Sequence, residues 1–253
     1  MTKKNLNLFF VFCLAGHGKR FTDKGINTPK YLLSFSGDRR SILEETIKSF
    51  RFEDDVKVIL CCNKKHIDSK NNLLEIILKN KLNADMLFVE DTLGQAHTAY
   101  IASKHINSNY KNYSTKPIVF FNGDTILKNR DLKKLTKKME DSNGLIDCFI
   151  SKDSKYSFIK ADQNNYVIDI EEKICISNKA TSGLYFFSSP VVFMQEFING
   201  GYMKSKTETY ISFVYKNMIE KNMKIKFHEE IDKENTIVLG TPEEYMHHLD
   251  SQE

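Results

Sequence analysis

Residues 14–21 have the sequence Leu14-Ala15-Gly16-His17-Gly18-Lys19-Arg20-Phe21. This glycine loop follows an apolar run from Phe9 to Leu14, and a short continuous run of that kind predicts a buried strand. Because glycine has no Cβ, the backbone at Gly16 and Gly18 can approach a ligand closely and point its N–H groups at phosphate oxygens. Three cations accompany the glycines: Lys19, Arg20 and Lys30. Together these features predict a nucleoside triphosphate site at the end of the first strand.

The loop differs from both common glycine motifs. It lacks the Gly-Lys-Ser/Thr ending of a P-loop and the third glycine of a dinucleotide fingerprint. Taken alone, it is also compatible with a tight turn after a strand. With Pro29-Lys30-Tyr31 behind it, however, the pattern resembles L-A-G-x-G-x-R-F followed by P-K, the signature of bacterial nucleotidyltransferases that make nucleotide-activated sugars and alcohols. The resemblance implies a Rossmann-like nucleotidyltransferase fold and catalytic roles for Arg20 and Lys30.

The composition is that of an ordinary globular chain. Of the 253 residues, 41% are hydrophobic and 28% are charged. The net charge of +4 is too small to indicate a nucleic-acid partner, and a local basic pocket for phosphates fits it better. The chain contains no run of about 18 apolar residues, the length that a membrane span requires. We therefore expect neither a nucleic-acid nor a membrane partner.

Two features bear on the cellular compartment. Residues 6–16 are apolar and follow Lys3-Lys4, which imitates a short signal peptide, but they continue into Gly-Lys-Arg-Phe and not into a small-residue cleavage site. The five cysteines form an odd set without C-x-x-C spacing, and most of them lie in apolar runs. They predict buried free thiols in a reducing compartment. We therefore expect a cytoplasmic protein.

In the first half of the chain, strand-like runs alternate with helix-like runs. The predicted strands are 9–14, 56–62, 86–89 and 118–121, and the predicted helices lie around 73–78, 94–106 and 131–141. This alternation predicts an α/β fold with a mixed, mostly parallel central sheet and helices on both faces.

The second half has a different pattern. It predicts a hairpin from strands 157–161 and 167–170 around the turn 162–165, then strands 182–187, 225–228 and 237–239, and helices 208–221 and 242–249. No linker or repeat interrupts the chain. We therefore expect one domain over residues 1–253, with a nucleotide-binding half of about 1–130 and an acceptor-binding half of about 131–253.

A carboxylate follows the predicted strand 118–121, within Asn122-Gly123-Asp124-Thr125. Ligands of open α/β sheets bind at the carboxyl ends of the strands, and Mg²⁺ takes oxygen ligands that it often shares with phosphates. Asp124 alone is also compatible with an ordinary turn. The resemblance favours Asp124 as a metal ligand, with Asn122 and Gly123 beside the nucleotide. The D-x-D of sugar-transferring relatives is absent, which argues against a glycosyltransferase.

A second segment, Thr92-Leu93-Gly94-Gln95-Ala96, resembles the base-recognition element of the family. Gln95 offers a donor and an acceptor, which suits the edge of a base. We expect Gly94 to permit close approach and the helix that begins there to have free amides, although simple capping of that helix by Thr92 is an alternative. The residues expected to bind the nucleotide are Leu14, Ala15, Gly16, His17, Gly18, Lys19, Thr92, Gly94, Gln95, Ala96, Asn122 and Gly123.

The acceptor side is indicated by Glu171-Glu172-Lys173 and by the segment 180–187 that contains Gly183. In the family, such elements line the acceptor site. The resemblance implies that Lys173 binds the phosphate of the acceptor and takes part in catalysis, and that Glu172 orients this lysine or binds an acceptor hydroxyl. Glu208, in a later family element, is expected on the same side. We assign no second metal ligand.

The implied reaction is nucleotidyl transfer from a nucleoside triphosphate to a phosphorylated small-molecule acceptor, with Mg²⁺ as cofactor and release of pyrophosphate. We expect CTP as the donor, with UTP as the next candidate, in the synthesis of a capsule or surface polysaccharide. A homodimer is left open. The alternatives are a nucleotide-binding regulatory module without turnover and a glycosyltransferase of related fold.

Overall fold

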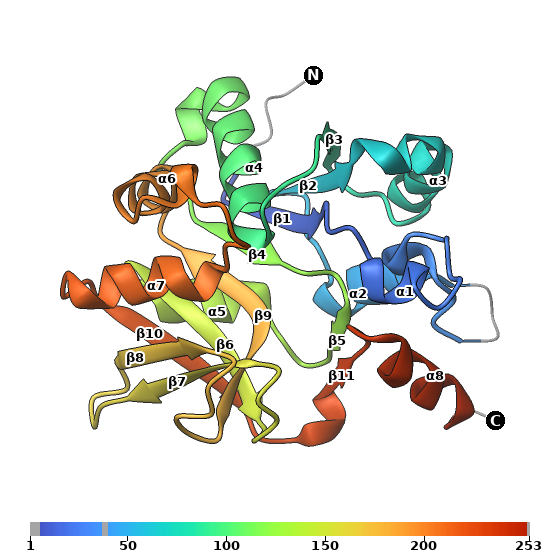
Figure 1. Cartoon of the computed structure of the whole chain (residues 1–253). Coiled ribbons are helices and arrows are strands. Elements are labelled where there is room, and N and C mark those ends of the chain that lie inside the picture. Colours follow the sequence, from blue (N-terminus) through green and yellow to red (C-terminus); the bar gives the residue numbers. More distant parts are fainter. Residues whose placement is uncertain (1–5, 37–39, 252–253) are drawn as a thin grey trace.

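The computed structural model of the chain describes residues 6–36 and 40–251. Lys3 and Lys4 therefore lie outside the described residues. The apolar run at the amino terminus forms β1 (Leu8–Leu14), a strand in the middle of the sheet (Figure 1). It pairs in parallel with β2 (Val56–Asn63) on one side and with β4 (Ile118–Phe121) on the other. A strand covered on both faces is apolar throughout, as this run is.

The main sheet has the order β10-β6-β9-β4-β1-β2-β3. Four of the six neighbouring pairs along this path are parallel, and β9 runs antiparallel to both of its neighbours. A hairpin of β7 and β8 extends from β9, and β5 and β11 form a small separate sheet. The remaining bounds are β3 (Ala84–Val89), β5 (Thr125–Leu127), β6 (Gly144–Ile150), β7 (Ser157–Ala161), β8 (Val167–Glu172), β9 (Lys179–Phe187), β10 (Ile225–Glu230) and β11 (Thr236–Val238).

Helices cover both faces of the sheet. On one face, α4 (Gln95–Asn109), α6 (Pro190–Asn199) and α7 (Ile211–Glu220) pack against residues such as Phe9 and Val11 of β1. On the other, α2 (Ile42–Phe50), α3 (Lys70–Lys79) and α5 (Leu132–Met139) pack against residues such as Phe10 and Phe12. Successive residues of β1 therefore point to opposite faces of the sheet, as the geometry of a strand requires. The predicted mixed, mostly parallel sheet with helices on both faces is confirmed.

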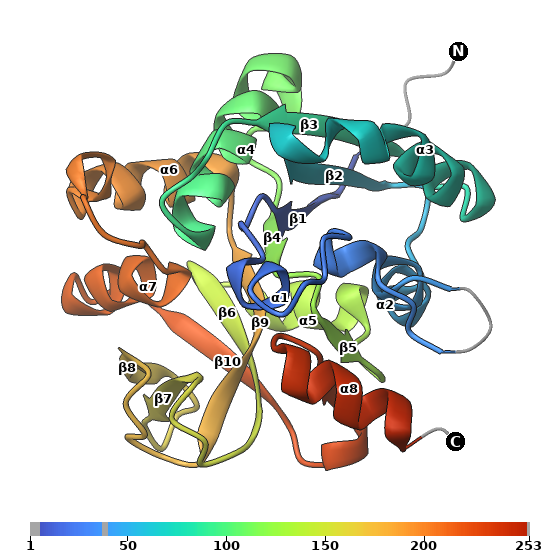
Figure 2. The same ribbon diagram turned by 45° about the vertical axis from the view of Figure 1, so that its right-hand side comes forward.

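Two short helices lie beside the small β5–β11 sheet. Figure 2 shows α1 (Lys19–Thr22) and α8 (Pro242–Asp250) in front of the main sheet. Phe21 of α1 and Tyr245 of α8 share a separate apolar cluster with Ile126 and Leu239. Short 3₁₀ segments complete the described elements: η1 (Lys30–Leu32), η2 (Lys64–Ser69), η3 (Lys111–Tyr113), η4 (Tyr202–Lys204) and η5 (Lys233–Asn235).

Several elements differ from the sequence prediction. The helix predicted from residue 208 begins only at Ile211, because Glu208 to Tyr210 run extended along the loop before α4. The elements α1, α2, α6, β5 and β6 were not predicted. The turn 162–165 is confirmed, with Asn165 in the left-handed region at φ 63°. Of the cysteines, Cys61, Cys62 and Cys148 are buried, whereas Cys175 is exposed. In the described part of the chain, no helix is long and apolar enough to cross a membrane.

Candidate active site

A cleft of about 750 Å³ opens at the carboxyl ends of β1 and β4, between these strands and the β7–β8 hairpin. The predicted site residues come from many separate segments, yet all of them except Ala15 and Ala96 line this cleft. Ala15 and Ala96 are buried behind its wall. The fold therefore brings the predicted nucleotide, metal and acceptor residues together at the edge of the sheet where α/β proteins bind ligands.

The glycine loop faces open space. No heavy atom lies within 4 Å of where a Cβ would stand at Gly16 or at Gly18. Gly18 has φ 62°, a conformation that favours glycine, and its carbonyl accepts the first hydrogen bonds of α1 from Phe21 and Thr22. Lys19 and Arg20 follow it and are exposed to the cleft. The loop thus leaves room for a ligand against its backbone, beside two cations.

Lys30 and Asp124 form an ion pair inside the cleft. The Nζ atom of Lys30 lies 2.6 Å from Oδ2 of Asp124, and both side chains are partly buried. The backbone carbonyl of Asp124 accepts a hydrogen bond of 2.8 Å from the amide of Leu239, which fixes the loop after β4 against β11. A Cβ at Gly240 would stand 3.5 Å from Asp124 Oδ2, so this glycine lies next to the carboxylate.

The residues around Asp124 fit the way in which proteins usually bind Mg²⁺, which does not require an all-protein cage. In residues 6–36 and 40–251, no group of three or more histidine, cysteine, aspartate or glutamate side chains could hold a metal ion. An all-protein cage is therefore not present in that part of the chain. One carboxylate with neighbouring space suits the usual mode, in which Mg²⁺ is held by one or two carboxylates, substrate phosphates and water.

The expected base-recognition segment begins α4, but its contacts differ from the prediction. Gly94 is the N-cap of the helix, whereas the Thr92 hydroxyl is bonded to Thr98 at 2.8 Å and caps nothing. The amide of Ala96 donates a hydrogen bond of 3.1 Å to the carbonyl of Thr209, so the expectation of free amides is wrong at this residue. Gln95 does face the cleft, where its amide donates to Asn122 Oδ1.

Gly94 is required for a reason other than ligand approach. Its φ is 92°, and a Cβ there would stand 2.6 Å from the carbonyl oxygen of Thr209 and 2.7 Å from Cγ of Glu208. The close neighbour of Gly94 is therefore another segment of the protein. Gly183 is similar, because a Cβ there would stand 2.8 Å from the side-chain nitrogen of Asn122. Both glycines line the cleft, but packing within the protein explains them.

His17 lies at the side of the glycine loop. Its Nδ1 atom is 3.6 Å from Oδ1 of Asp91, and half of the side chain is exposed. Asp91 also accepts hydrogen bonds from Lys65 and Asn63, which lower the pKa of its carboxyl group. Asn63 was not predicted. Its buried amide also donates to the carbonyl of Ala15 at 3.3 Å, and so ties the end of β2 to the start of the loop.

The acceptor residues lie at the open end of the β7–β8 hairpin. Oε2 of Glu172 accepts hydrogen bonds from Ser157 and, at 2.7 Å, from Ser212. Lys173 has the left-handed φ of 58°, and its ammonium donates to the hydroxyl of Tyr210 at 2.8 Å. The lysine is therefore held by Tyr210, and the hydroxyl groups that position Glu172 come from two serines.

Among the lining residues that the sequence analysis missed are Lys155, Tyr210 and Glu244. The ammonium of Lys155 lies 2.5 Å from Glu244 and 2.9 Å from Asp153. Burial disfavours its charged form, but these hydrogen bonds outweigh burial and raise the pKa of Lys155 above its ordinary value. Lys155 lies in a polar stretch without a motif, and only the geometry of the hairpin brings it to α8.

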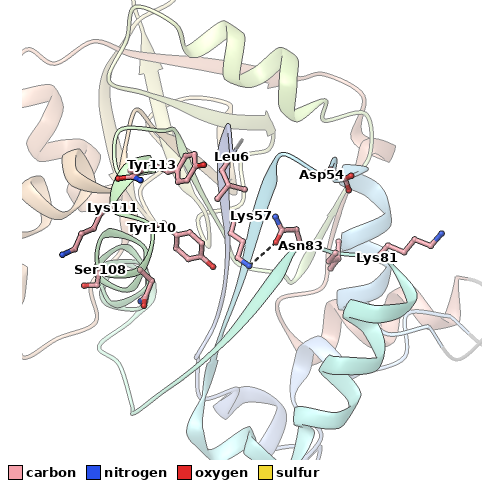
Figure 3. A pocket seen from close by; sticks show the side chains of 12 residues that line it. Leu6, Asp54, Lys57, Lys81, Asn83, Ser108, Tyr110, Lys111 and Tyr113 are labelled. Carbon is pink, nitrogen blue, oxygen red and sulfur yellow. Dashed lines mark hydrogen bonds between the residues drawn. The ribbon is translucent and has the colours of Figure 1, made fainter. Parts of the chain in front are cut away.

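A second hollow, of about 770 Å³, lies at the amino ends of β2 and β3 (Figure 3). Its wall contains Lys57, whose ammonium donates to Asn83 at 3.2 Å and lies 2.6 Å from Asp85. Tyr110 stands beside it and donates to Asp85 at 2.5 Å. This buried lysine is neutralised within the protein, and none of the predicted site residues lines the hollow. The cleft at the carboxyl ends is therefore the candidate active site.

A comparison with protein families identifies the family of the chain. The nucleotidyl transferase family model matches residues 12–236 of the chain. The chain belongs to the nucleotidyl transferase family. The match runs from β1 and the glycine loop to the start of β11, so it includes both walls of the cleft. No match was found among curated protein sequences.

Solved structures share the fold of this nucleotidyl transferase. A nucleoside-diphosphate-sugar pyrophosphorylase from Vibrio cholerae RC9 superposes with a TM-score of 0.80 at 22% identity, over 95% of this chain and 99% of that one. A UDP-glucose pyrophosphorylase in complex with UDP-glucose gives 0.74 at 15% identity, over 98% of each chain. HddC from Yersinia pseudotuberculosis gives 0.67 at 19% identity, over 98% of this chain and 100% of that one. At these identities the likeness shows a common fold.

Proposed function

We propose that the chain transfers CMP from CTP to the phosphate of a small-molecule acceptor and releases pyrophosphate. The proposal rests on one observation above all. The open glycine loop, the Lys30–Asp124 pair and Lys173 line a single cleft. A triphosphate against the loop and a phosphate at Lys173 would meet in that cleft, with cations on both sides. Membership of the nucleotidyl transferase family supports this reaction class.

In the proposed reaction, an oxygen of the acceptor phosphate attacks the α-phosphorus of CTP. A new P–O bond forms there, the bond to the β-phosphate oxygen breaks, and the electron pair leaves with pyrophosphate. The attacking phosphate is already an anion at neutral pH, so no residue has to remove a proton. Catalysis then depends on alignment and on neutralising charge that develops on the phosphates.

The cations predicted from the sequence each have a role in this scheme. Arg20, assisted by Lys19, holds the phosphates that leave as pyrophosphate, and Lys30 neutralises the α-phosphate. Lys173 holds the acceptor phosphate as a compact positive charge. Asp124 would hold Mg²⁺, which, when bound, supplies positive charge next to the triphosphate. The position of Lys30 against Asp124 supports both assignments, because it places a cation and a carboxylate at one point of the cleft.

The preference for CTP, with UTP next, is supported by two side-chain amides. Gln95 donates to Asn122, and both line the cleft beside Leu14 and Gly16. Amide groups offer donors and acceptors to the edge of a pyrimidine. Cytosine and uracil exchange a donor for an acceptor, so a pocket fitted to one leaves buried polar groups unpaired with the other.

For the acceptor, we propose a phosphorylated precursor of a capsule or surface polysaccharide, with phosphoglutamine of capsular phosphoramidate as the specific candidate. A sugar phosphate is the second candidate, because solved structures that share the fold are named as sugar-nucleotide pyrophosphorylases. We place the enzyme in the cytoplasm and propose a single domain with a nucleotide half and an acceptor half.

The test is a matrix of CTP, UTP, dTTP, ATP and GTP against phosphorylated acceptors that include phosphoglutamine and glucose 1-phosphate, with pyrophosphate release as the readout. We expect the largest rate with CTP and release that requires an acceptor. Pyrophosphate release with a purine triphosphate alone would overturn the base assignment. Nucleotide binding without release would favour a regulatory module.

A further inference from the structure

The extended segment Glu208–Tyr210 lies between the two sides of the cleft. On the nucleotide side, Thr209 bonds to the loop before α4: its amide donates to the carbonyl of Leu93 at 2.8 Å, and its own carbonyl accepts from Ala96 at 3.1 Å. On the acceptor side, the next residue, Tyr210, contacts Lys173. Thr209 is buried, whereas Tyr210 is half-buried at the cleft surface. The segment is thus anchored at Thr209 and presents Tyr210 to the cleft.

Tyr210 contacts Lys173 in two ways. The ammonium donates a hydrogen bond of 2.8 Å to the phenol oxygen, and it lies 4.6 Å from the centre of the ring. A cation at that distance from an aromatic ring is attracted by it. The phenol in turn donates its own proton to Oε2 of Glu208. The phenol oxygen is therefore free to accept from Lys173, because its hydrogen is directed at the carboxylate.

This arrangement holds Lys173 without neutralising it directly. Burial and the hydrogen bond to Glu208 raise the pKa of the Tyr210 phenol above its ordinary value, so the ring stays uncharged at neutral pH. Among residues 6–36 and 40–251, Lys173 forms no ion pair with a carboxylate, in contrast to Lys30 and Lys155. The backbone of Lys173 is also fixed, since its amide donates to the carbonyl of Tyr156 at 3.0 Å.

We propose that Tyr210 is a positioning residue for the acceptor: its phenol holds the ammonium of Lys173 at the acceptor side of the cleft and leaves the positive charge available for the acceptor phosphate. This inference rests on the proposed function, in which Lys173 binds that phosphate. Glu208, predicted to bind the acceptor, then acts through Tyr210, because it orients the phenol proton.

The hydroxyl of Tyr210 contacts Glu208 and Lys173, and no other polar partner in the described part of the chain. Removal of the hydroxyl in Tyr210→Phe therefore affects this chain of contacts while the ring is kept. Tyr202→Phe is a matched control. In the described residues its hydroxyl makes one structural hydrogen bond, to the carbonyl of Phe213 at 2.8 Å, and Tyr202 does not line the cleft.

The first measurement is steady-state pyrophosphate release by the wild type, Tyr210→Phe and Tyr202→Phe. We expect Tyr210→Phe to raise the KM of the acceptor by roughly five- to tenfold, the effect of one hydrogen bond of ordinary net strength, with the KM of CTP changed less than twofold. Tyr202→Phe should match the wild type in both. An equal rise in both KM values, or the same rise in Tyr202→Phe, would overturn the inference.

The second measurement does not depend on turnover. The hydrogen bond from Lys173 to Tyr210, aided by the charges of Glu172 and Glu208, raises the pKa of the lysine. Loss of the hydroxyl should therefore lower the pKa of Lys173 and increase the fraction of its side chain that is an uncharged amine. We expect an acylating reagent at pH 8.5 to modify Lys173 at least twofold faster in Tyr210→Phe than in the wild type, as followed by peptide mass spectrometry. An unchanged rate would overturn the inference. If Lys173 is modified faster in Tyr210→Phe but the wild type releases no pyrophosphate, the result would instead contradict the proposed function.

Discussion

The ammonium of Lys30 lies 2.6 Å from Oδ2 of Asp124, although 94 positions separate the two residues in the sequence. Lys30 begins η1, and Asp124 stands between β4 and β5. The two side chains are 26% and 15% exposed, so water screens the pair only in part. The pair orients a carboxylate at the point of the cleft where we propose that Mg²⁺ and the α-phosphate bind.

The first prediction concerns Asp124. Asp124→Asn keeps the shape of the side chain and removes its charge, so it should abolish the dependence of the rate on Mg²⁺ concentration and lower turnover by roughly 100-fold or more. Initial rates measured over a Mg²⁺ titration give the result. An unaltered titration curve and rate in this variant would show that Asp124 is not the metal ligand.

The second prediction concerns the leaving phosphates. Arg20→Ala should lower turnover by roughly 100-fold, because a fixed charge that stabilises the departing pyrophosphate is lost. Lys24→Ala is the control: Lys24 is near in sequence and, among the described residues, pairs only with the exposed Glu243, at 3.9 Å, so its removal should change neither rate nor stability measurably. Wild-type turnover in Arg20→Ala would refute the assignment of the glycine loop.

The third prediction separates two reasons for a glycine. Gly94→Ala places a Cβ against the backbone of Thr209, and it should lower the melting temperature and raise the KM of both CTP and the acceptor, because Thr209 holds Tyr210 in place. Gly25→Ala has a similar positive φ, of 78°, but no atom within 4 Å of the new Cβ. Each alanine incurs backbone strain of about 1–3 kcal/mol. Equal effects of the two variants would mean that strain alone, and not the contact with Thr209, explains Gly94.

The fourth prediction is a pH dependence of stability. Burial disfavours the charged form of Asp85, but hydrogen bonds from Lys57 and Tyr110 outweigh burial and lower the pKa of its carboxyl group. A lowered pKa in the folded state stabilises the fold above the ordinary carboxyl pKa of about 4, and this contribution is lost as the pH falls through the lowered value. Asp85→Asn should therefore be less stable than the wild type in urea at pH 7, and the difference should shrink towards pH 3. A constant difference would contradict the assignment.

Local sequence patterns predicted much of the fold. β1 was recognisable because seven consecutive residues are apolar, and the glycine loop because its two glycines follow this apolar run and precede Lys19 and Arg20. The helix α2 was missed although Ser41 and Glu44 form a capping box, a signal that the sequence does contain. β6 contains Asp147, whose charge interrupts the apolar run and is matched in space by the buried Arg130.

The site was less predictable in its details than in its location. Motif order placed most of the predicted residues at one cleft, but the contacts between them depend on pairs that are distant in sequence. Tyr210 reaches Lys173 across 37 positions, and no local pattern indicates that contact. Gly94 was also predicted only in part. The sequence indicated that glycine is needed at this position, but the reason, the close carbonyl oxygen of Thr209, is visible only in the structure.

The central claim is tested most directly by the acceptor dependence of pyrophosphate release from CTP by the wild-type protein with Mg²⁺. We expect release to be negligible with CTP alone and to become rapid, and stoichiometric with the nucleotide-linked product, when a phosphorylated acceptor such as phosphoglutamine or glucose 1-phosphate is added. CTP binding without pyrophosphate release across the whole acceptor panel would contradict the account.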